Sequence, residues 1–530
     1  MRIHLIRAVT LGFFVNACNA EQSASRAPLG GLAPGLEALA SKNDTVPQLD
    51  DELVQADGEA ASATKSPKQN PGQNPGQNPE QNPGQNPAQN AEQNPGQTPG
   101  QQPTPTPVPS PGPLRVLPNL LPFANDEGAA STFTSLGSID LSNAFFRELG
   151  TNGRSCVTCH DPRTGWSITP SFVRERFLAT GGLDPIFRSN DGSVSPQADV
   201  STVSARAAAY NMLLTKGLIR VGLRVPPAAE FDLVRVEDPY NFASPTELSL
   251  FRRPLPPANL RFLTNVMWDG RESVASSLSD NLKVQANNAT VGHGQGAALS
   301  NELRQELVDF ETSLFAAQSL DRLQMSLSAG GAMGGPQALG QVAFVPGVND
   351  PRKPNFNFNV FSLYTAWLND SNPARQSVAR GEVIFNRRPL VVQGVGGLND
   401  LVGAARVTTT CSGCHNTPNV GSSSIGDLMD LGLAQGALRT PDMPLYTLRH
   451  KATGTLVTST DPGRALVTGR WADMNRFKVP GLRNLAARAP FFHNGTAPSV
   501  SAVVDFYNRR FGMGLSTTER RDLEAFLNAL

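Results

Sequence analysis

The sequence lacks an excess of charge of either sign. Its 530 residues include 45 Lys and Arg and 45 Asp and Glu, so the formal net charge is zero. A chain that binds nucleic acid or another polyanion carries an excess of basic residues, and we therefore expect no such partner. Long apolar runs are also missing, apart from one at residues 8–15 that is too short to span a bilayer. A small polar or neutral substrate fits this balance better.

Cysteine is scarce as well, with five in the whole chain. Cys18 follows a basic start and the short apolar run, an arrangement typical of a secretory signal, and Val15 to Cys18 resembles a bacterial lipid-attachment sequence. We expect a lipoprotein-type signal peptide over residues 1–18, and an exported protein, either periplasmic or an outer-membrane or cell-surface lipoprotein. Membrane contact would come only through a lipid on Cys18. A plain cleaved signal with an incidental cysteine is the alternative.

Large apolar residues are rare in residues 19–113, whose second half repeats Asn-Pro-Gly-Gln and then becomes rich in Pro and Thr. Such a segment has little to bury, and its prolines remove backbone hydrogen-bond donors. We expect a disordered Pro/Gln/Asn-rich tether here.

The remainder shows helical patterns more than strand patterns. Apolar residues recur at helical spacing in residues 140–149 and 373–388, and Ser516 with Glu519 forms a capping box ahead of a final helix. Apart from a possible hairpin at residues 217–236, no alternating strand series is evident. We therefore expect a mainly α fold.

The four remaining cysteines lie in two copies of one motif. Cys-x-x-Cys-His is the attachment signature of c-type haem, in which two thioethers fix the porphyrin and the adjacent histidine binds the iron. A thioredoxin-like redox pair, a zinc site or disulfides are the alternatives. The haem interpretation uses every cysteine of the folded part and predicts two covalently bound haem c groups. The motif residues are Cys156, Cys159 and His160, and Cys411, Cys414 and His415.

Two further motifs accompany the cysteines: Trp-Asp-Gly-Arg at residues 268–271, and the stretch FKVPGLRNLAARAPFFHNG at residues 477–495. Together with the cysteine motifs they resemble the bacterial di-haem cytochrome c peroxidase family, including its MauG-like relative that oxidises tryptophans of a partner protein. The resemblance implies two cytochrome c domains with extended loops over the first haem. The N-terminal domain, 114–371, would hold the peroxidatic haem, and 372–530 the electron-transfer haem. Trp268 would lie between them and help electrons cross.

The resemblance also implies a peroxide pocket near the first haem. Gln285 matches the pocket glutamine of the family, but the position of its catalytic glutamate falls on Gln295. An amide cannot transfer the proton that peroxide cleavage requires, whereas His293 can. We therefore predict His293 as the acid-base group, with Gln285 or Gln295 orienting the oxidant; a structural role for His293 is the alternative. No histidine follows His160 closely, which predicts an open position on the first iron.

The second iron needs a sixth ligand. In the family this ligand lies fourteen residues after the histidine of a His-Asn-Gly motif, as a methionine in the peroxidases and a tyrosine in the MauG-like relative. Counting from His493 gives Tyr507. We predict Tyr507 as the ligand, with His493, Met443 or Met474 as alternatives, whereas Met513 lies six residues too late. Tyr507 could also be an ordinary core aromatic.

The expected reaction is the reduction of hydrogen peroxide to water with electrons from a small redox protein such as a cytochrome. A MauG-like or oxygenase-like enzyme that oxidises an organic or protein substrate is the second interpretation, and a non-enzymatic electron-transfer cytochrome is the third. The calcium ion of the family is doubtful here, because its asparagine position falls on Arg253, whose charge could replace the ion. The backbone carbonyls expected to complete that site belong to Arg488 and Pro490.

Overall fold

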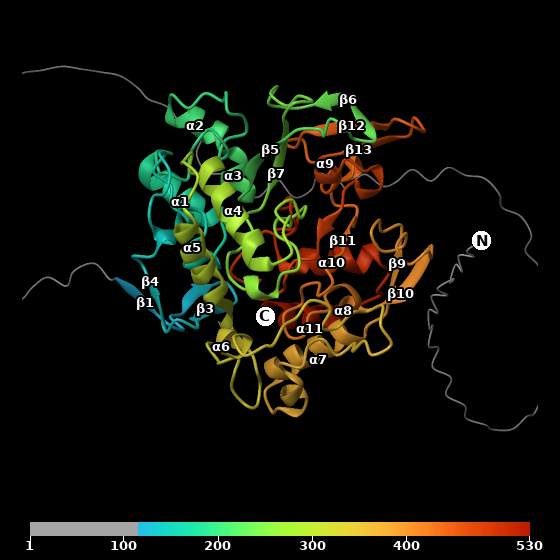
Figure 1. Ribbon diagram of the computed structural model, residues 1–530. Coiled ribbons are helices and arrows are strands. Elements are labelled where there is room, and N and C mark those ends of the chain that lie inside the picture. The colour runs from blue at the N-terminus through green and yellow to red at the C-terminus, as the bar shows by residue number, and fades with distance from the viewer. Residues whose placement is uncertain (1–114) are drawn as a thin grey trace, which may run out of the picture. The chain divides into compact units, whose positions relative to one another are not determined.

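The structure is a computed structural model that describes residues 115–530 (Figure 1). The expected signal peptide, the lipid-attachment cysteine and the tether lie outside these residues. Within residues 115–530, no helix is both long enough and apolar enough to cross a membrane. The helices are α1 (Pro170–Thr180), α2 (Val203–Ala209), α3 (Asn211–Lys216), α4 (Leu278–Gly292), α5 (Asn301–Ser313), α6 (Gly335–Leu339), α7 (Pro373–Arg387), α8 (Cys411–Cys414), α9 (Ala465–Thr468), α10 (Val500–Arg510) and α11 (Thr517–Asn528).

The expected mainly α class is wrong. Helix accounts for 30% and strand for 17% of the described structure, and the strands pair into two-stranded and three-stranded sheets. Residues of β7 are all buried, as are nearly all residues of β3, and a strand buried on both faces shows no alternation of apolar and polar residues. The strands are β1 (Val116–Pro118), β2 (Phe123–Asn125), β3 (Gly128–Thr134), β4 (Ser138–Asp140), β5 (Ile219–Leu223), β6 (Phe231–Glu237), β7 (Leu248–Arg252), β8 (Leu314–Leu320), β9 (Leu390–Gln393), β10 (Arg406–Thr409), β11 (Leu428–Met429), β12 (Leu445–His450), β13 (Leu456–Ser459) and β14 (Phe477–Lys478).

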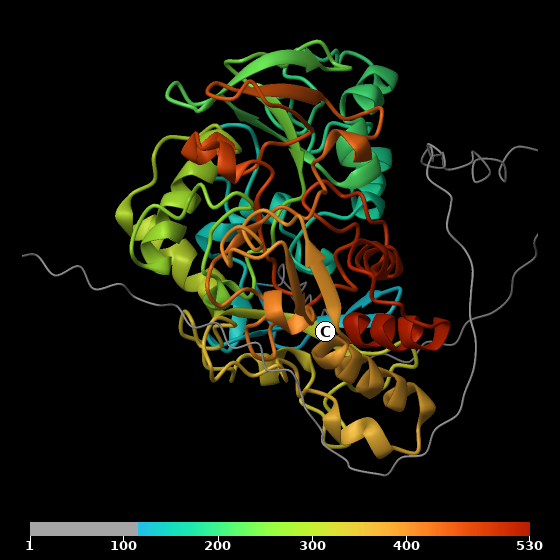
Figure 2. The same cartoon turned by 90° about the vertical axis from the view of Figure 1, so that its right-hand side faces the viewer.

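The predicted hairpin at residues 217–236 is also wrong, although both of its strands exist. β5 pairs with β7, whereas β6 pairs with β12. The connection contains Pro226 and Pro227, which lack the N–H that a continuing ladder would need. The β13-β12-β6 sheet therefore joins segments from the two predicted domains, as the adjacent green and orange strands in Figure 2 show.

An α-helix at residues 140–149 does not form. β4 ends at Asp140, and only a 3₁₀ turn at Ala144–Phe146 follows. Asp140 and Asn143 each accept a hydrogen bond from a backbone N–H two residues later, a local pairing that competes with the helical ladder. The apolar residues of this segment are spaced as in a helix, and Phe145 is buried, but the segment forms no continuous helix.

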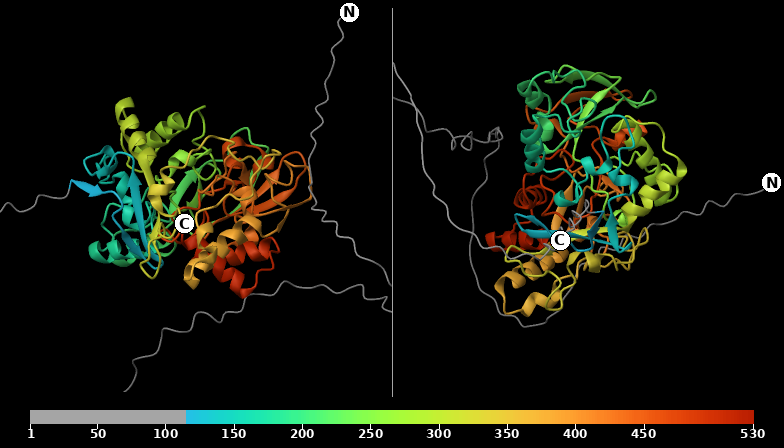
Figure 3. Two further views of the ribbon diagram at one scale, coloured as in Figure 1. Left: turned by 90° about the horizontal axis from the view of Figure 1, so that it is seen from below. Right: turned by 90° about the vertical axis from the view of Figure 1, so that its left-hand side faces the viewer.

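The C-terminal helices agree with the sequence patterns. The expected helix at residues 373–388 is α7, and Ser516 and Glu519 form the predicted capping box of α11. α7 and α11 pack closely at Gly381, where an added Cβ would lie 2.0 Å from the carbonyl oxygen of Asp522. The two helices lie side by side, in orange and red, in both views of Figure 3. Their core forms part of the wall behind the second cysteine motif.

Candidate functional site

The second cysteine motif forms the short helix α8, and His415 leaves it as the C-terminal cap. The Nδ1–H of His415 donates to the carbonyl oxygen of Gly421 at 2.6 Å, because a carbonyl can only accept. This fixes the tautomer and leaves Nε2 with a free lone pair, as a metal-binding histidine requires. Burial lowers the pKa of His415 to about 4, so the ring is neutral at ordinary pH.

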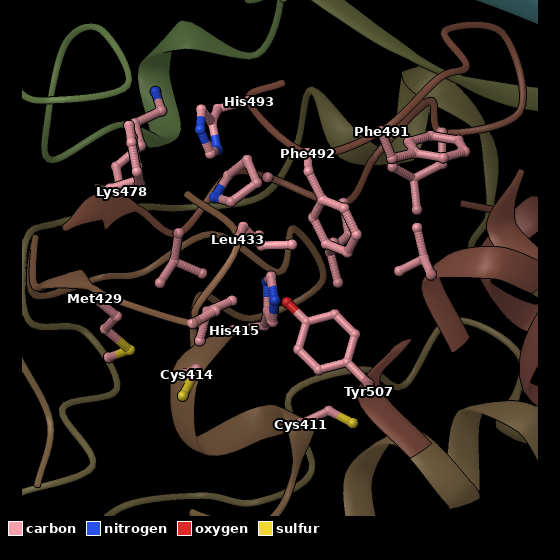
Figure 4. Close-up of a pocket in the computed structure, with 18 of the residues that line it drawn as sticks. Cys411, Cys414, His415, Met429, Leu433, Lys478, Phe491, Phe492, His493 and Tyr507 are labelled. Atoms are coloured by element: carbon pink, nitrogen blue, oxygen red, sulfur yellow. The ribbon is translucent and has the colours of Figure 1, made fainter. Parts of the chain in front are cut away.

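A large, mostly apolar cavity opens over His415 and both cysteines of α8. Tyr507 reaches it from α10, and its hydroxyl points toward His415 in Figure 4. Burial, together with the neighbouring cysteines, raises the pKa of Tyr507 well above its usual value. A phenol in this environment loses its proton only if a cation approaches it closely.

Of the alternative ligands for this position, His493 also lines the cavity, as does Met513, which lies too late in the sequence to match the ligand position of the family. Met443 and Met474 instead belong to separate core clusters and do not line it. Figure 4 shows His493 beside Lys478 at one end of the cavity, away from Cys411 and Cys414. Tyr507 and His493 therefore line the same cavity but lie at different places in it.

Trp268 lines the same cavity. Its indole Nε1–H donates to the carbonyl oxygen of Arg253 at 2.8 Å. Its ring lies edge-on to the imidazole of His493, with centroids 6.3 Å apart, and the imidazole stacks on Phe477 at 3.9 Å. Trp268 is thus held in one orientation by both a hydrogen bond and aromatic packing.

The first cysteine motif repeats the tautomer seen in the second. A 3₁₀ turn carries Cys156, and the Nδ1–H of His160 donates to the carbonyl oxygen of Trp166 at 3.1 Å. Burial lowers the pKa of His160 to about 4. Two adjoining cavities are lined by His160, and both are also lined by Gln285 and Glu311.

His293 and Gln285, predicted for the peroxide pocket, are brought together near His160. Gln285 lies on α4, and His293 caps the C-terminus of that helix and lines the cavity that also contains both cysteines. Gln295 lines neither cavity. Its side chain accepts from Asn152, and its backbone has a positive φ of 53° in the loop after α4.

Two carboxylates at this site were missed by the sequence reasoning. Asp191 accepts a hydrogen bond from Nδ1 of His293 and forms an ion pair of 2.5 Å with Arg154. Glu311 on α5 is 7% exposed, and its Oε2 has no hydrogen-bond partner. Burial raises the pKa of Glu311 to about 8. The sequence could have indicated that Glu311 is buried, because it follows Leu307 by four residues and so lies on the apolar face of an amphipathic helix.

At the position expected for the calcium site, the guanidinium of Arg253 donates to the carbonyl oxygen of Arg488 at 3.0 Å. That carbonyl is one of the two that the family resemblance assigned to the ion. A guanidinium and a metal ion cannot share it easily, because both would bring positive charge to one oxygen.

The alternatives to haem gain no support from the geometry. Among residues 115–530, no three His, Cys, Asp or Glu side chains are grouped so that they could hold a metal ion by themselves. The four motif cysteines are free thiols rather than disulfides. Burial raises the pKa of Cys156, Cys411 and Cys414 to about 12, which favours the protonated thiol over the thiolate that a zinc site needs.

The sequence matches no protein-family model. It is 38% identical over 133 residues to cytochrome-c peroxidase IdrP2 of Denitromonas iodatirespirans, a match that covers 23% of this chain and 35% of the relative. Cytochrome-c peroxidase IdrP1 of Pseudomonas sp. (strain SCT) is 30% identical over 181 residues, covering 30% of this chain and 41% of the relative. Cytochrome c peroxidase Ccp of Escherichia coli (strain K12) is 41% identical over 75 residues, covering 14% and 16%.

The chain thus spans less than half the length of the curated relatives it matches. A crystal structure of a MauG-like protein associated with microbial copper homeostasis aligns with 15% identity and a TM-score of 0.30, over 54% of this chain and 76% of that one. The matches to curated peroxidases confirm that the sequence is similar to bacterial cytochrome c peroxidases, as the sequence motifs predicted.

Proposed function

We propose that this chain binds two haem c groups covalently and reduces hydrogen peroxide to water at the His160 site. Electrons would come from a small redox protein through the His415 site. Residues 114–371 would form the peroxidatic domain and 372–530 the electron-transfer domain. One observation carries the proposal. In both cysteine motifs, the histidine lines a cavity, its Nδ1–H donates to a backbone carbonyl, and its Nε2 is free.

The residues present fit the proposed groups. Each histidine is flanked by two free thiols that could form thioethers, and the walls of the larger cavity are mainly apolar, as a porphyrin face requires. When bound, haem supplies the redox chemistry, which protein side chains cannot provide. Export of the protein follows from this proposal, because covalent haem attachment takes place outside the cytoplasm.

The protein's own part in the reaction is proton transfer and positioning. Peroxide reduction consumes two protons and two electrons and gives two waters. Cleavage of the O–O bond needs a group that takes a proton from one oxygen and returns a proton to the leaving oxygen. His293 is our candidate for that transfer, since Nδ1 is engaged by Asp191 and only Nε2 remains free. Gln285 would orient the peroxide by hydrogen bonding, and Trp268 would carry electrons between the two sites.

Haem content and spin state test this proposal. We expect two haems per purified chain by pyridine haemochrome assay, and one after replacement of either cysteine pair by alanine. Electron paramagnetic resonance should show one high-spin and one low-spin ferric signal. A chain with two low-spin signals would lack the open position that peroxide needs, and absence of turnover with reduced cytochrome would contradict the peroxidase activity.

A second function is favoured by one feature, the hydroxyl of Tyr507 facing His415. An anionic oxygen ligand stabilises the ferric and higher states and makes the site a poor acceptor of electrons from a cytochrome. Oxidation of an organic or protein substrate would then replace peroxide reduction as the productive reaction. One assay distinguishes the two functions. If peroxide consumption requires reduced cytochrome, the peroxidase is supported. If peroxide is consumed without reduced cytochrome, the substrate oxidase is supported.

A further inference from the structure

Three basic side chains that line the larger cavity are buried or half-buried: Arg253, Lys478 and Arg488. Arg253 is 4% exposed and Lys478 is 7% exposed. Among residues 115–530, none of the three has an acidic partner within ion-pair distance. They donate only to backbone carbonyl oxygens, of which Asn265 lies 3.2 Å from Lys478 and Gly481 lies 2.7 Å from Arg488.

A buried cation without an acidic partner is costly, and proteins usually avoid it. Elsewhere in the described residues, the fully buried Arg252 forms ion pairs with both Asp269 and Asp461 at 2.6 Å, whereas the buried Arg483 donates only to backbone carbonyl oxygens. Burial and the like charge of Arg488 lower the pKa of Lys478 to about 8. The Nε–H of Arg488 has no hydrogen-bond partner at all. The described residues therefore provide no anionic partner for this cluster.

In both sites, the basic residues lie away from the motif cysteines. In the larger cavity, Figure 4 shows Lys478 at the end opposite Cys411 and Cys414. Near His160, Lys478 and Arg488 line the cavity that contains neither cysteine, and the motif cysteines line the adjoining one. Lys478 and Arg488 also line the larger cavity, so one pair of cations faces both sites.

His493 belongs to the same end of the larger cavity. It is 1% exposed, and its Nε2 has no hydrogen-bond partner. Figure 4 shows it beside Lys478 rather than beside the cysteines. A buried imidazole with a free nitrogen normally has a partner, so the missing anion would satisfy His493 as well.

The chemistry of haem c identifies that anion. Its two thioether bonds form on one edge of the porphyrin, and its two propionate carboxylates extend from another edge, away from the cysteines. We propose that Arg253, Lys478 and Arg488 form one carboxylate-binding site for the propionates of both haems, and that His493 hydrogen-bonds to these propionates instead of binding iron. This inference rests on the two proposed haems.

A shared cation has a measurable consequence. Reduction adds one negative charge to each haem, and a nearby positive charge favours that state. The removal of Lys478 should therefore lower both midpoint potentials, because the same ammonium faces both sites. A residue that served only the folding of one domain would not shift both potentials in the same direction.

The test is a potentiometric titration of the purified full-length holoprotein, with the haem-to-protein ratio measured first. We expect Lys478→Met to shift both midpoint potentials to more negative values, and Lys478→Arg to leave both near those of the wild type. Lys451→Met is the matched control, since Lys451 also donates to a backbone carbonyl but lines none of the cavities. Wild-type protein without two haems would overturn the proposed function; two haems with neither potential or only one changed in Lys478→Met would overturn this inference alone.

A second variant tests the role of His493 separately. We expect His493→Gln to keep the low-spin ferric signal of the second haem, because an amide can also donate to a propionate. Loss of that signal in His493→Gln, with both haems still present, would show His493 to be an iron ligand and would overturn its assignment to the propionates.

Discussion

The carboxylate of Asp191 accepts a hydrogen bond from ring Nδ1 of His293, across 102 residues of sequence. Arg154 holds the other oxygen of the same carboxylate and also donates to the backbone carbonyl of His293 at 3.2 Å. Burial by itself would raise the pKa of Asp191, but the hydrogen bond from His293 and the charge of Arg154 lower this pKa below its usual value. Asp191 therefore stays ionised and fixes both the tautomer and the orientation of the ring.

The first prediction concerns this pair. We expect His293→Ala to lower kcat/KM for hydrogen peroxide by about 10²-fold or more, the usual size of a general acid-base contribution. Asp191→Asn should cost at least about 10-fold, because an amide no longer imposes one tautomer. Steady-state turnover with a reduced cytochrome, measured across pH, checks both. Asp199→Asn is the control, since Asp199 is exposed and touches neither residue; equal losses in Asp199→Asn and Asp191→Asn would rule out the positioning role.

The second prediction concerns Glu311, whose pKa is raised to about 8 by burial. The folded chain keeps this proton after an unfolded chain would have lost it, so Glu311 favours the folded state most at low pH. That stability is lost as pH rises from about 4.5 toward 8, by up to ~1.4 kcal/mol per pH unit. We expect Glu311→Gln to be more stable relative to wild type at pH 8 than at pH 5, as measured by urea unfolding of the holoproteins. A difference that is the same at both pH values would mean that Glu311 is ionised when folded.

The third prediction concerns the sixth ligand of the second haem. Methionine favours ferrous iron, whereas an anionic tyrosine oxygen favours ferric iron. We expect Tyr507→Met to raise the midpoint potential of the second haem and to change its low-spin electron paramagnetic resonance signal. Tyr240→Phe removes a hydrogen-bonded hydroxyl outside the cavity and should change neither. An unchanged spectrum in Tyr507→Met would identify Tyr507 as a core aromatic.

The fourth prediction concerns the buried ion pairs behind Trp268. Replacing Arg252 with methionine leaves Asp461 buried without an ion-pair partner and leaves Asp269 with Arg271 alone. We expect a loss of about 3–5 kcal/mol in the free energy of unfolding. The exposed pair of Arg449 and Asp232 provides the comparison, because Arg449→Met should cost less than ~1 kcal/mol. Chemical denaturation of the two variants checks the contrast. Similar losses would mean that the buried pairs contribute no more than a surface pair.

Part of the fold was predictable because its signals are local. Helices α7 and α11 follow from apolar spacing and from caps that involve residues only a few positions apart. The sheets were not predictable in this way, since β6 finds its partner in β12 about two hundred residues later. A strand that is buried on both faces, such as β7, also lacks the alternation that would reveal it.

The sequence by itself determined the two cysteine motifs, because two thiols and a histidine within five residues are held together by the covalent chain. It also determined that Tyr507 and His493 are candidates, through their fixed spacing. Tertiary structure decided which groups meet: Asp191 with His293, and Lys478 with both cavities. These contacts depend on the packing of segments that are distant in the sequence. Burial then changes the charge and the hydrogen bonding of a side chain, and it leaves no pattern in the sequence.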